Sequence, residues 1–152
     1  MSVAVAIDSL VYVPEKPTVF SELTSALDER GITGISDLVM RSSVTDYERR
    51  VVDRFADAWD IPPPITQEEY RRALLDGGFE DVTVQDVTAN SVGRFRKWTT
   101  SYRWFTSWPT GRVIDSLLWY YRLDPSAIDE QIRRAHEALP MLQHVIIAAR
   151  AG

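Results

Sequence analysis

The chain has 152 residues, 45% of them hydrophobic and 26% charged, which is the composition of a single globular domain. Its net charge of −5 argues against a nucleic-acid partner, because phosphate binding depends on clustered lysine and arginine. Cysteine is absent, which excludes disulfides, thiolate metal sites and a cysteine nucleophile. No segment has the apolar length of a membrane span or the basic start of a signal peptide, so we expect a cytoplasmic protein with no membrane contact. Two histidines and acidic residues without metal-loop spacing predict no built-in metal site.

The first part of the chain alternates between strand and helix patterns. Val3–Ile7 is a short, continuous apolar run, which is typical of a strand buried on both faces of a parallel sheet. Residues 19–27 carry one apolar stripe at helical spacing, and Gly31 follows that stripe as a stop signal. Ile32–Met40 is a second apolar run. We therefore expect a strand, a helix and a second strand, in this order.

Two threonines, each followed three residues later by a glutamate, have the spacing of a capping box. Thr45 is expected to begin a helix that runs to about Trp59. Thr66 is expected to begin another helix, which ends at the glycine pair 77–78. Residues 79–87 alternate in part between apolar and polar side chains, which indicates a third strand.

The segment 91–121 is unusually rich in tryptophan, tyrosine and phenylalanine. After it, Asp124 and the proline that follows have the chemistry of a helix start. Residues 141–149 form a last apolar run that predicts a final strand. We expect one domain over residues 1–152, with a helical insert at about 91–139.

Residues 6–16, 35–39 and 69–82 resemble stretches of class I S-adenosylmethionine-dependent methyltransferases that act on small molecules such as quinones, tocopherols, amines and terpenoid precursors. The third stretch is the most specific, because it matches that family's helix, double-glycine turn and penultimate strand residue by residue. The resemblance covers about residues 3–87 and returns at 144–150. It implies an α/β fold that is the C-terminal half of a class I methyltransferase sheet, which is Rossmann-like, with strand order 4-5-7-6 and a helical aromatic lid insert.

The half of the family fold that holds the cofactor has no counterpart in this sequence. In the family, a glycine-rich loop approaches the methionine part of the cofactor, and an acid binds the ribose. The earliest glycine here is Gly31, which comes after the strand that resembles the family's fourth. Val11 and Tyr12 also stand where the family commonly has an aromatic residue and a histidine, in a loop that faces the cofactor. The resemblance therefore implies that S-adenosylmethionine binds only if a partner supplies the missing half, and that the chain alone uses no cofactor.

The implied strand order leaves Val3–Ile7 at an open edge of the sheet. An exposed apolar edge strand promotes aggregation unless another strand pairs with it or another element covers it. Two partners meet this need: a second copy of the chain, which gives a homodimer, or a separate chain that carries the missing half. We favour the homodimer, because two-fold homo-oligomers are the commonest assemblies.

Asp8 and Asp37 each end one of two adjacent parallel strands, and open α/β sheets place their ligands at the carboxyl ends of strands. If both face one cavity, their repulsion raises one pKa and makes an acid/base pair. The alternative is that each caps a helix or holds a loop. Tyr12 is the third candidate catalytic residue, since it lies just beyond Asp8. For substrate binding, Arg41 could hold an anionic group or pair with a carboxylate, and Trp59 lies either against the substrate, as in the similar enzymes, or on the solvated surface.

The aromatic residues of the insert are candidates for an apolar substrate pocket, because large rings offer area to flat or polyene ligands. Alternatively they belong to the core or to a dimer interface. His136 and His144 could each be a general base at neutral pH, although a solvated helix position and an interfacial strand position also explain them. The aromatic candidates are Trp98, Tyr102, Trp104, Phe105, Trp108, Trp119 and Tyr120.

Four functions are compatible with these residues. The first is a cofactor-independent enzyme that keeps the acceptor pocket of a methyltransferase and uses it for acid/base cyclisation or isomerisation of an apolar metabolite. The second is one subunit of a split S-adenosylmethionine-dependent methyltransferase. The third is a non-catalytic binding or regulatory module, and the fourth is a truncated gene product without activity. We favour the first, because the residues at Val11 and Tyr12 depart from the family on the side that faces the cofactor.

Overall fold

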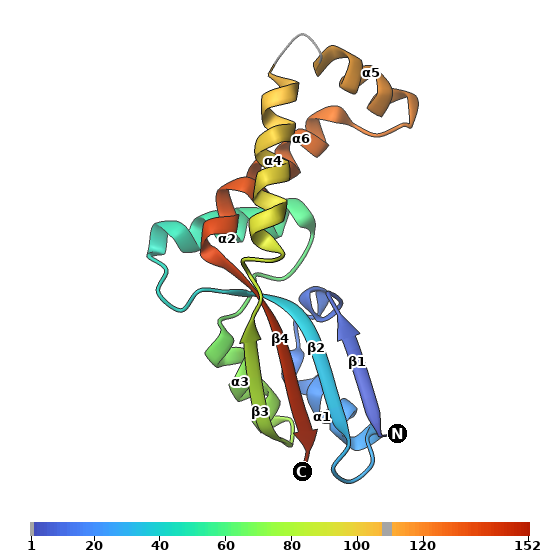
Figure 1. Ribbon diagram of the computed structural model, residues 1–152, viewed down its shortest axis with the longest axis vertical. Helices are drawn as coiled ribbons and strands as arrows, with labels where there is room; N and C mark the ends of the chain where they lie inside the picture. Colours follow the sequence, from blue (N-terminus) through green and yellow to red (C-terminus); the bar gives the residue numbers. More distant parts are fainter. Residues whose placement is uncertain (1, 108–110) are drawn as a thin grey trace.

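The computed structural model describes residues 2–107 and 111–152 of the chain. Figure 1 shows a twisted sheet with helices behind it and a layer of further helices beyond one of its ends. The elements are, in chain order, β1 (Val3–Ile7), the short helix η1 (Leu10–Tyr12), α1 (Lys16–Ala26), β2 (Ile32–Met40), α2 (Asp46–Trp59), α3 (Gln67–Asp76), β3 (Phe79–Asp86), α4 (Val92–Thr106), α5 (Gly111–Tyr120), α6 (Pro125–Ala138), the short helix η2 (Leu139–Met141) and β4 (Leu142–Ala151).

The four strands form one mixed sheet with the order β1-β2-β4-β3. β1 and β2 run parallel, and β4 lies antiparallel to both of its neighbours. This order confirms the prediction, in which the last strand inserts between the second and the third. The insertion brings the start of β4 beside the end of β2, where Met40 pairs with Leu142. Side chains from distant parts of the chain therefore meet at this end of the sheet.

One face of the sheet packs against α1 and α3, and this contact forms the main core. Phe20 of α1 and Tyr70 of α3 are fully buried, with ring centroids 5.5 Å apart. Ile35 of β2 and Ile147 of β4 belong to the same cluster. Burial of one such side chain stabilises a fold by about 1.5–3 kcal/mol. These contacts hold β2 and β4, which carry Ser36, Asp37 and His144 of the site described below, in a fixed position.

The helices begin at the capping residues that the sequence predicts. Thr45 and Thr66 each accept a hydrogen bond from the backbone N–H three residues on. Each threonine N–H in turn donates to the carboxylate of the glutamate at that position. Asp124 caps α6 through the backbone N–H two residues later. Only α1 begins earlier than predicted, at Lys16. The reason is that Pro17 fits the first turn, where a missing N–H costs no intrahelical hydrogen bond.

β1 is apolar on both faces, but only one of them is covered. Ala4 and Ala6 pack toward the core, whereas the alternate residues of β1 are 58% to 70% exposed. The expectation of a strand buried on both faces is therefore wrong for the described residues, because α1 and α3 lie on the same side of the sheet. We call the other side the uncovered sheet face, and its exposed apolar residues are Val3, Val5, Ile7, Ile32 and Ile146.

The helices beyond the sheet form a second layer. A small core holds this layer to the sheet, with Val52 and Phe55 of α2, Ala135 of α6 and Leu142 of β4 in one cluster. From there α4 and α5 project away from the sheet as an arm, whose described residues are 92–107 and 111–123 (Figure 1). None of the described helices is long and apolar enough to cross a bilayer.

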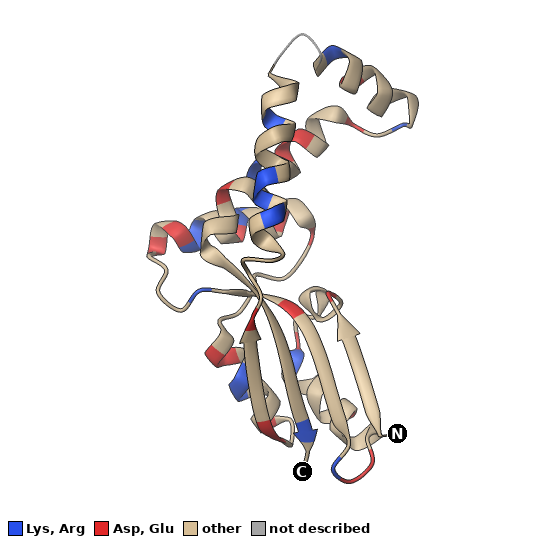
Figure 2. Cartoon of the chain, in the orientation of Figure 1, with Lys and Arg blue, Asp and Glu red and all other residues tan. Residues whose placement is uncertain are grey.

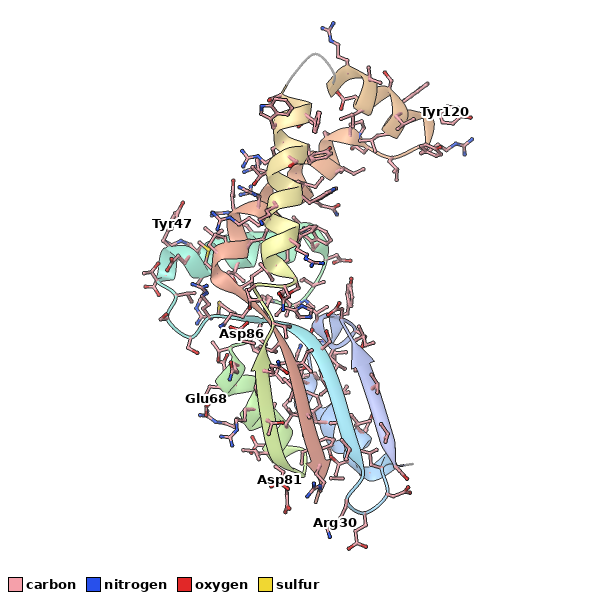
Figure 3. The ribbon with its side chains drawn as sticks, viewed as in Figure 1. Arg30, Tyr47, Glu68, Asp81, Asp86 and Tyr120 are labelled. Atoms are coloured by element: carbon pink, nitrogen blue, oxygen red, sulfur yellow. The ribbon has the colours of Figure 1, made fainter. Side chains whose placement is uncertain are left out.

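The arm and the rest of the molecule carry opposite charge. Residues 92–123 hold six basic side chains and one acidic one, a net charge of +5, so the remainder of a chain with net charge −5 carries −10. Figure 2 shows the basic residues along α4 and the acidic ones mostly below it. Large apolar side chains are also exposed on the arm: Trp119 is 78% exposed, and Tyr120 lies at its far end (Figure 3).

Candidate functional site

A cavity of about 390 Å³ lies where the carboxyl ends of β1 and β2 and the start of β4 meet the helical layer. Most of its wall is apolar, and its polar groups come from the strand ends. The first turn of α4 and the C-terminal part of α2 form the opposite side. The cavity is lined by Asp8, Val11, Tyr12, Asp37, Leu38, Phe55, Trp59, Ile61, Ser91, Val92, Phe95, Leu139, Leu142 and His144.

Asp8, Ser36 and His144 form a polar cluster at the sheet end of the cavity. Asp8 follows β1 in a left-handed backbone conformation, φ 47°, which aspartate tolerates better than most residues. Its N–H donates to the Ser36 carbonyl oxygen at 2.8 Å, and its Oδ1 accepts the Ser36 hydroxyl at 3.1 Å. His144 Nε2 lies 2.8 Å from Ser36 Oγ and 3.2 Å from Asp8 Oδ1. Three different strands or strand ends therefore contribute to one cluster.

The cluster is not a nucleophilic triad. In such a triad the serine and the carboxylate occupy different ring nitrogens of the histidine. Here Ser36 and Asp8 both lie against Nε2, so the carboxylate, which only accepts hydrogen bonds, places the proton on this nitrogen. The other nitrogen, Nδ1, is then the basic one. The arrangement equips His144 to accept a proton and Asp8 to hold the ring, but it does not activate Ser36 as a nucleophile.

Asp37 lies on the opposite face of β2 from Ser36, because neighbouring residues of a strand alternate. Its carboxylate is fully buried and accepts the Tyr70 hydroxyl at 2.9 Å and the Leu38 N–H at 2.9 Å. Burial raises the pKa of Asp37, while these hydrogen bonds and the charge of Lys16 partly oppose the rise. Burial and the charge of Asp37 likewise raise the pKa of the Tyr70 hydroxyl, so it stays a donor.

Lys16 completes this buried network. Its ammonium donates to the carbonyl oxygens of Leu10 and Val13, at 2.9 and 3.1 Å, and lies 5.8 Å from the centre of the Tyr70 ring. Burial lowers the pKa of Lys16, and the charge of Asp37 works against this. The lysine therefore ties the loop after β1, which carries Asp8, to the floor of the cavity.

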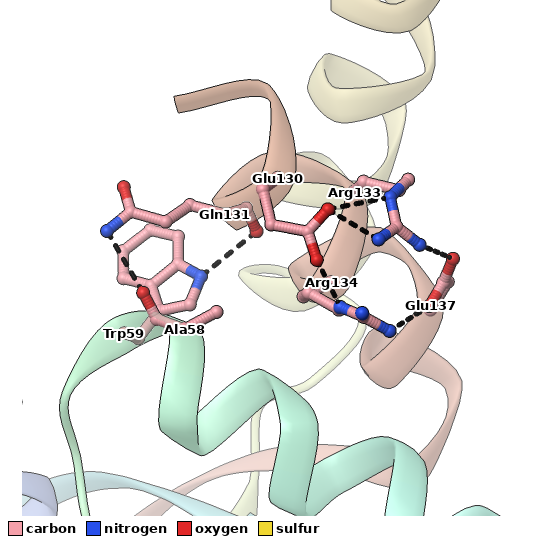
Figure 4. Close-up of polar contacts among 7 residues, drawn as sticks. All are labelled: Ala58, Trp59, Glu130, Gln131, Arg133, Arg134 and Glu137. Carbon is pink, nitrogen blue, oxygen red and sulfur yellow. Dashed lines mark hydrogen bonds and ion pairs between the residues drawn. The ribbon is translucent and has the colours of Figure 1, made fainter. Parts of the chain in front are cut away.

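The aromatic wall of the cavity is held in place from α6. Phe55 and Trp59 of α2 pack with ring centroids 6.0 Å apart. The Trp59 indole N–H donates to the Gln131 carbonyl oxygen at 3.1 Å, and the Gln131 side chain donates to the Ala58 carbonyl oxygen at 3.0 Å (Figure 4). Phe95 of α4 supplies a third ring. The wall is thus a fixed surface.

The structure brings four of the predicted site residues together: Asp8, Tyr12, Asp37 and Trp59 all line the cavity. Arg41 does not line it and is exposed. Hydrogen bonds from Thr88 are the main cause of the lowered pKa of Asp86, and the charge of Arg41 adds a smaller part. The predicted pair of aspartates is therefore near one cavity, but the two carboxylates turn to opposite faces of the sheet.

The described aromatic candidates of the insert lie away from this cavity. Trp98 and Tyr102 stack on each other along α4, and Tyr102 borders a separate polar hollow between α4 and α6. Trp119 and Tyr120 border a shallow hollow at the tip of the arm. Trp104 and Phe105 form a pair further along α4, and Trp108 lies outside the described residues. Only the first turn of α4 reaches the cavity, through Ser91, Val92 and Phe95.

The described residues that line the cavity do not include the side chains and glycines that would hold a metal ion or S-adenosylmethionine. Among the described residues there is no group of three or more histidine and acidic side chains placed to hold a metal ion. S-adenosylmethionine, which the fold implies, requires close backbone approach through glycine. The cavity lining contains no glycine, and Val11 and Tyr12 occupy the turn after Asp8. The residues present do not fit this cofactor by themselves.

No protein-family model matches the chain, and no curated protein matches its sequence. Solved structures do match. A putative sarcosine dimethylglycine methyltransferase from Galdieria sulphuraria has a TM-score of 0.71 over 98% of this chain and 52% of its own, at 14% identity. The [4+2]-cyclase SpnF has a TM-score of 0.65 over 99% of this chain and 49% of its own, at 17% identity. A geranyl diphosphate C-methyltransferase from Streptomyces coelicolor A3(2) has a TM-score of 0.67 over 100% of this chain and 46% of its own, at 16% identity.

The chain therefore has the α/β architecture of class I S-adenosylmethionine-dependent methyltransferases, and its sheet matches half of their Rossmann-like fold. It spans about half the length of the structures named above. At these identities the likeness concerns the fold, and the chemistry of the site depends on the residues just described.

Proposed function

We propose that the chain is a methyltransferase-like enzyme that binds an apolar small molecule in this cavity and catalyses proton transfer on it without S-adenosylmethionine, as in a cyclisation or isomerisation. One observation carries the proposal: His144 and Asp8 meet at the polar end of a cavity that is otherwise apolar. A low-dielectric wall strengthens the interaction of such groups with a bound ligand. The [4+2]-cyclase SpnF supports it further, because that protein pairs a similar fold with a reaction other than methyl transfer.

In this mechanism His144 and Asp8 exchange a proton with the ligand. The exposed Asp8 carboxylate holds the Nε2 proton of His144, so Nδ1 takes a proton from the ligand. As the ring becomes positively charged, the carboxylate at 3.2 Å stabilises it. Asp37 lies on the other face of β2, where burial raises its pKa and the charge of Asp8 adds to the rise, so the two carboxylates are electrostatically coupled. Tyr12 lies at the cavity wall, where its hydroxyl is within the reach of a ligand.

Replacing His144 with glutamine is expected to lower turnover of the true substrate by about 100-fold, the effect of losing a general base. Asp8→Asn should lower it too, because the imidazolium loses its counter-charge. The measurement is product formation by mass spectrometry with a panel of polyene and terpenoid candidates. His136→Gln is the matched control, since His136 bonds to Thr99 on the arm and does not line the cavity. Equal rates for wild type and His144→Gln would rule out the mechanism.

A second candidate function is a part of an S-adenosylmethionine-dependent methyltransferase, completed by another polypeptide. The uncovered sheet face favours it, because Val5 and Ile7 expose 68% and 70% of their surface at an edge strand that pairs only with β2 in the described part of the chain. A partner strand could add to the outer edge of β1 while its helices cover this face. A second copy of the chain could cover the same surface, which would give a homodimer and leave the first function intact.

Val5→Lys is expected to weaken either association at least tenfold, because a charge would be buried at the contact. Sedimentation velocity at several protein concentrations would show whether wild type dimerises and whether the variant does not. Glu22→Lys is the control, because Glu22 is exposed on α1, which lies on the other side of the sheet. Tight calorimetric binding of S-adenosylmethionine by the purified chain alone would contradict the favoured function, and binding only after a partner is added would support the second. A monomeric wild type without a copurifying partner would exclude both assemblies.

A further inference from the structure

We propose that the cavity selects a positively charged ligand: an organic ammonium ion attached to an apolar body. This rests on the proposed function in one respect, that the cavity is a ligand site. The lining contains two carboxylates and a histidine but neither lysine nor arginine. A ligand that brings a cation would compensate the charge of Asp8, which faces no lysine or arginine in the lining.

Asp8 is the residue that meets the cation. Its carboxylate is fixed by Ser36 and His144, which both lie against Oδ1, and no hydrogen bond among the described residues reaches Oδ2. The side chain is 63% exposed at the mouth of the cavity. A free, oriented carboxylate oxygen at the polar end of an apolar cavity is suited to an N⁺–H donor, since charge-assisted hydrogen bonds are about twice as strong as neutral ones.

Asp37 does not offer the same charge to a ligand. Both of its oxygens already accept hydrogen bonds, one from Tyr70 and one from Leu38, and its side chain has no exposed surface. The nearby Lys16 ammonium is also committed to backbone carbonyls below the cavity. The positive charge of this lysine therefore compensates Asp37 and leaves Asp8 for the ligand.

The aromatic wall suits a cation with attached carbon. Phe55, Trp59 and Phe95 line the cavity, and the Trp59 ring is fixed by Gln131. The face of an aromatic ring attracts an ammonium group, most strongly for tryptophan and when the site excludes water. The same rings bury the apolar body of the ligand. A carboxylate and aromatic rings around one cavity are the elements with which proteins recognise organic ammonium ions.

The same lining disfavours anionic ligands. A phosphate or diphosphate would need basic side chains or a metal ion. The lining provides no basic side chain, and the described residues hold no cluster for a metal. The cavity therefore differs in charge from a site that would hold a diphosphate with Mg²⁺.

The test compares three small probes of similar shape and different charge: phenethylamine as the cation, phenethyl alcohol as the neutral form and phenylacetate as the anion. Binding to the full chain is followed at neutral pH through the indole N–H resonance of Trp59, assigned by its loss in Trp59→Phe. We expect phenethylamine to bind about tenfold more tightly than the alcohol, and phenylacetate most weakly. Asp8→Asn should remove the advantage of the cation and leave the alcohol unchanged.

Asp81→Asn is the matched control, because Asp81 is also exposed, has the same left-handed backbone, φ 49°, and lies outside the cavity. This variant should bind all three probes as wild type does. If the alcohol binds as tightly as the amine, the charge selectivity is wrong while the cavity remains a ligand site. Tighter binding of phenylacetate overturns the selectivity too. If none of the probes shifts the Trp59 resonance, the selectivity and the proposed function both fail.

Discussion

Replacing Tyr70 with phenylalanine is expected to lower the free energy of unfolding by about 2 kcal/mol at neutral pH, the scale of a hydrogen bond to a charged group. The Tyr70 hydroxyl donates to Asp37 Oδ2 at 2.9 Å, and both groups are fully buried. Without the hydroxyl, the carboxylate loses one of the two hydrogen bonds that offset its burial. Because this bond favours the charged form of Asp37, the cost should be smaller in acid, where the carboxyl is protonated.

The measurement is urea unfolding of wild type and Tyr70→Phe at neutral and at acidic pH. Tyr47→Phe is the control, because Tyr47 is a 64% exposed tyrosine on α2 (Figure 3), so its hydroxyl is available to solvent in the folded chain. A cost that is the same at both pH values would show that the hydroxyl does not bind a titrating carboxyl.

The carboxyl group of Asp37 also makes the free energy of unfolding depend on pH. Burial raises the pKa of Asp37 in the folded chain above its unfolded value of about 3.9. Its contribution to stability is therefore fully present below that unfolded value and is lost as the pH rises through the raised, folded value. Asp37→Asn does not titrate, so the stability of wild type relative to this variant should fall over the same interval. The comparison separates the pH dependence that Asp37 causes from that of other carboxyls, such as Glu48 and Glu69, whose pKa values are lowered by their capping hydrogen bonds.

Replacing Gly77 with alanine should destabilise the fold by about 3 kcal/mol, at the upper end of what forcing an extra atom into a packed site costs. A Cβ at this position would lie 2.6 Å from Phe20 Cβ and 3.1 Å from the Phe20 backbone carbon. The turn after α3 and the buried face of α1 cannot both stay in place. Since α1 carries Lys16, the displacement would reach the network beneath the cavity.

The control for this substitution is Gly34→Ala. A Cβ at Gly34, on the uncovered sheet face, meets no atom within 4 Å, so alanine should be neutral or stabilise the strand by about 0.5–1 kcal/mol. Thermal unfolding by circular dichroism compares the two variants with wild type. Equal melting temperatures for Gly77→Ala and wild type would contradict the close packing between α3 and α1.

Local rules predicted much of this fold. The bounds of β1 and β2, both capping boxes and the cap at Asp124 follow from residue patterns over a few positions, and the structure confirms them. The strand order came from the resemblance of the double-glycine stretch and its surroundings to a known fold. Local patterns did not predict that β1 would be covered on one face only. Apolar side chains on both faces of a strand show that both faces are suited to burial, but they do not show which element, if any, packs against each face.

The candidate site was predicted in part, for a physical reason. The sequence predicts that Asp8 and Asp37 both end strands, which is correct for Asp8 and wrong for Asp37, because β2 continues to Met40. Alternation along β2 then turns Asp37 away from Asp8. His144, which completes the cluster, lies more than 100 residues further on, and only the antiparallel register that pairs it with Leu38 brings it there. A histidine where similar strands usually carry an apolar residue was the available signal. The length and direction of α4, which carry most of the aromatic residues away from the cavity, depend on packing against α6 that residue spacing does not encode.

The opposite charges of the arm and of the rest of the molecule make it an electric dipole along its longest axis. Its net charge of −5 understates how strongly each end responds to its surroundings. In an external field the arm, with +5, would turn toward negative potential and the rest, with −10, away from it. At physiological salt such fields reach only about 8 Å from a surface, so the orientation would be imposed during the last steps of an encounter. The distribution of charge along the molecule therefore determines which end of this protein turns toward a charged neighbour before a specific contact forms.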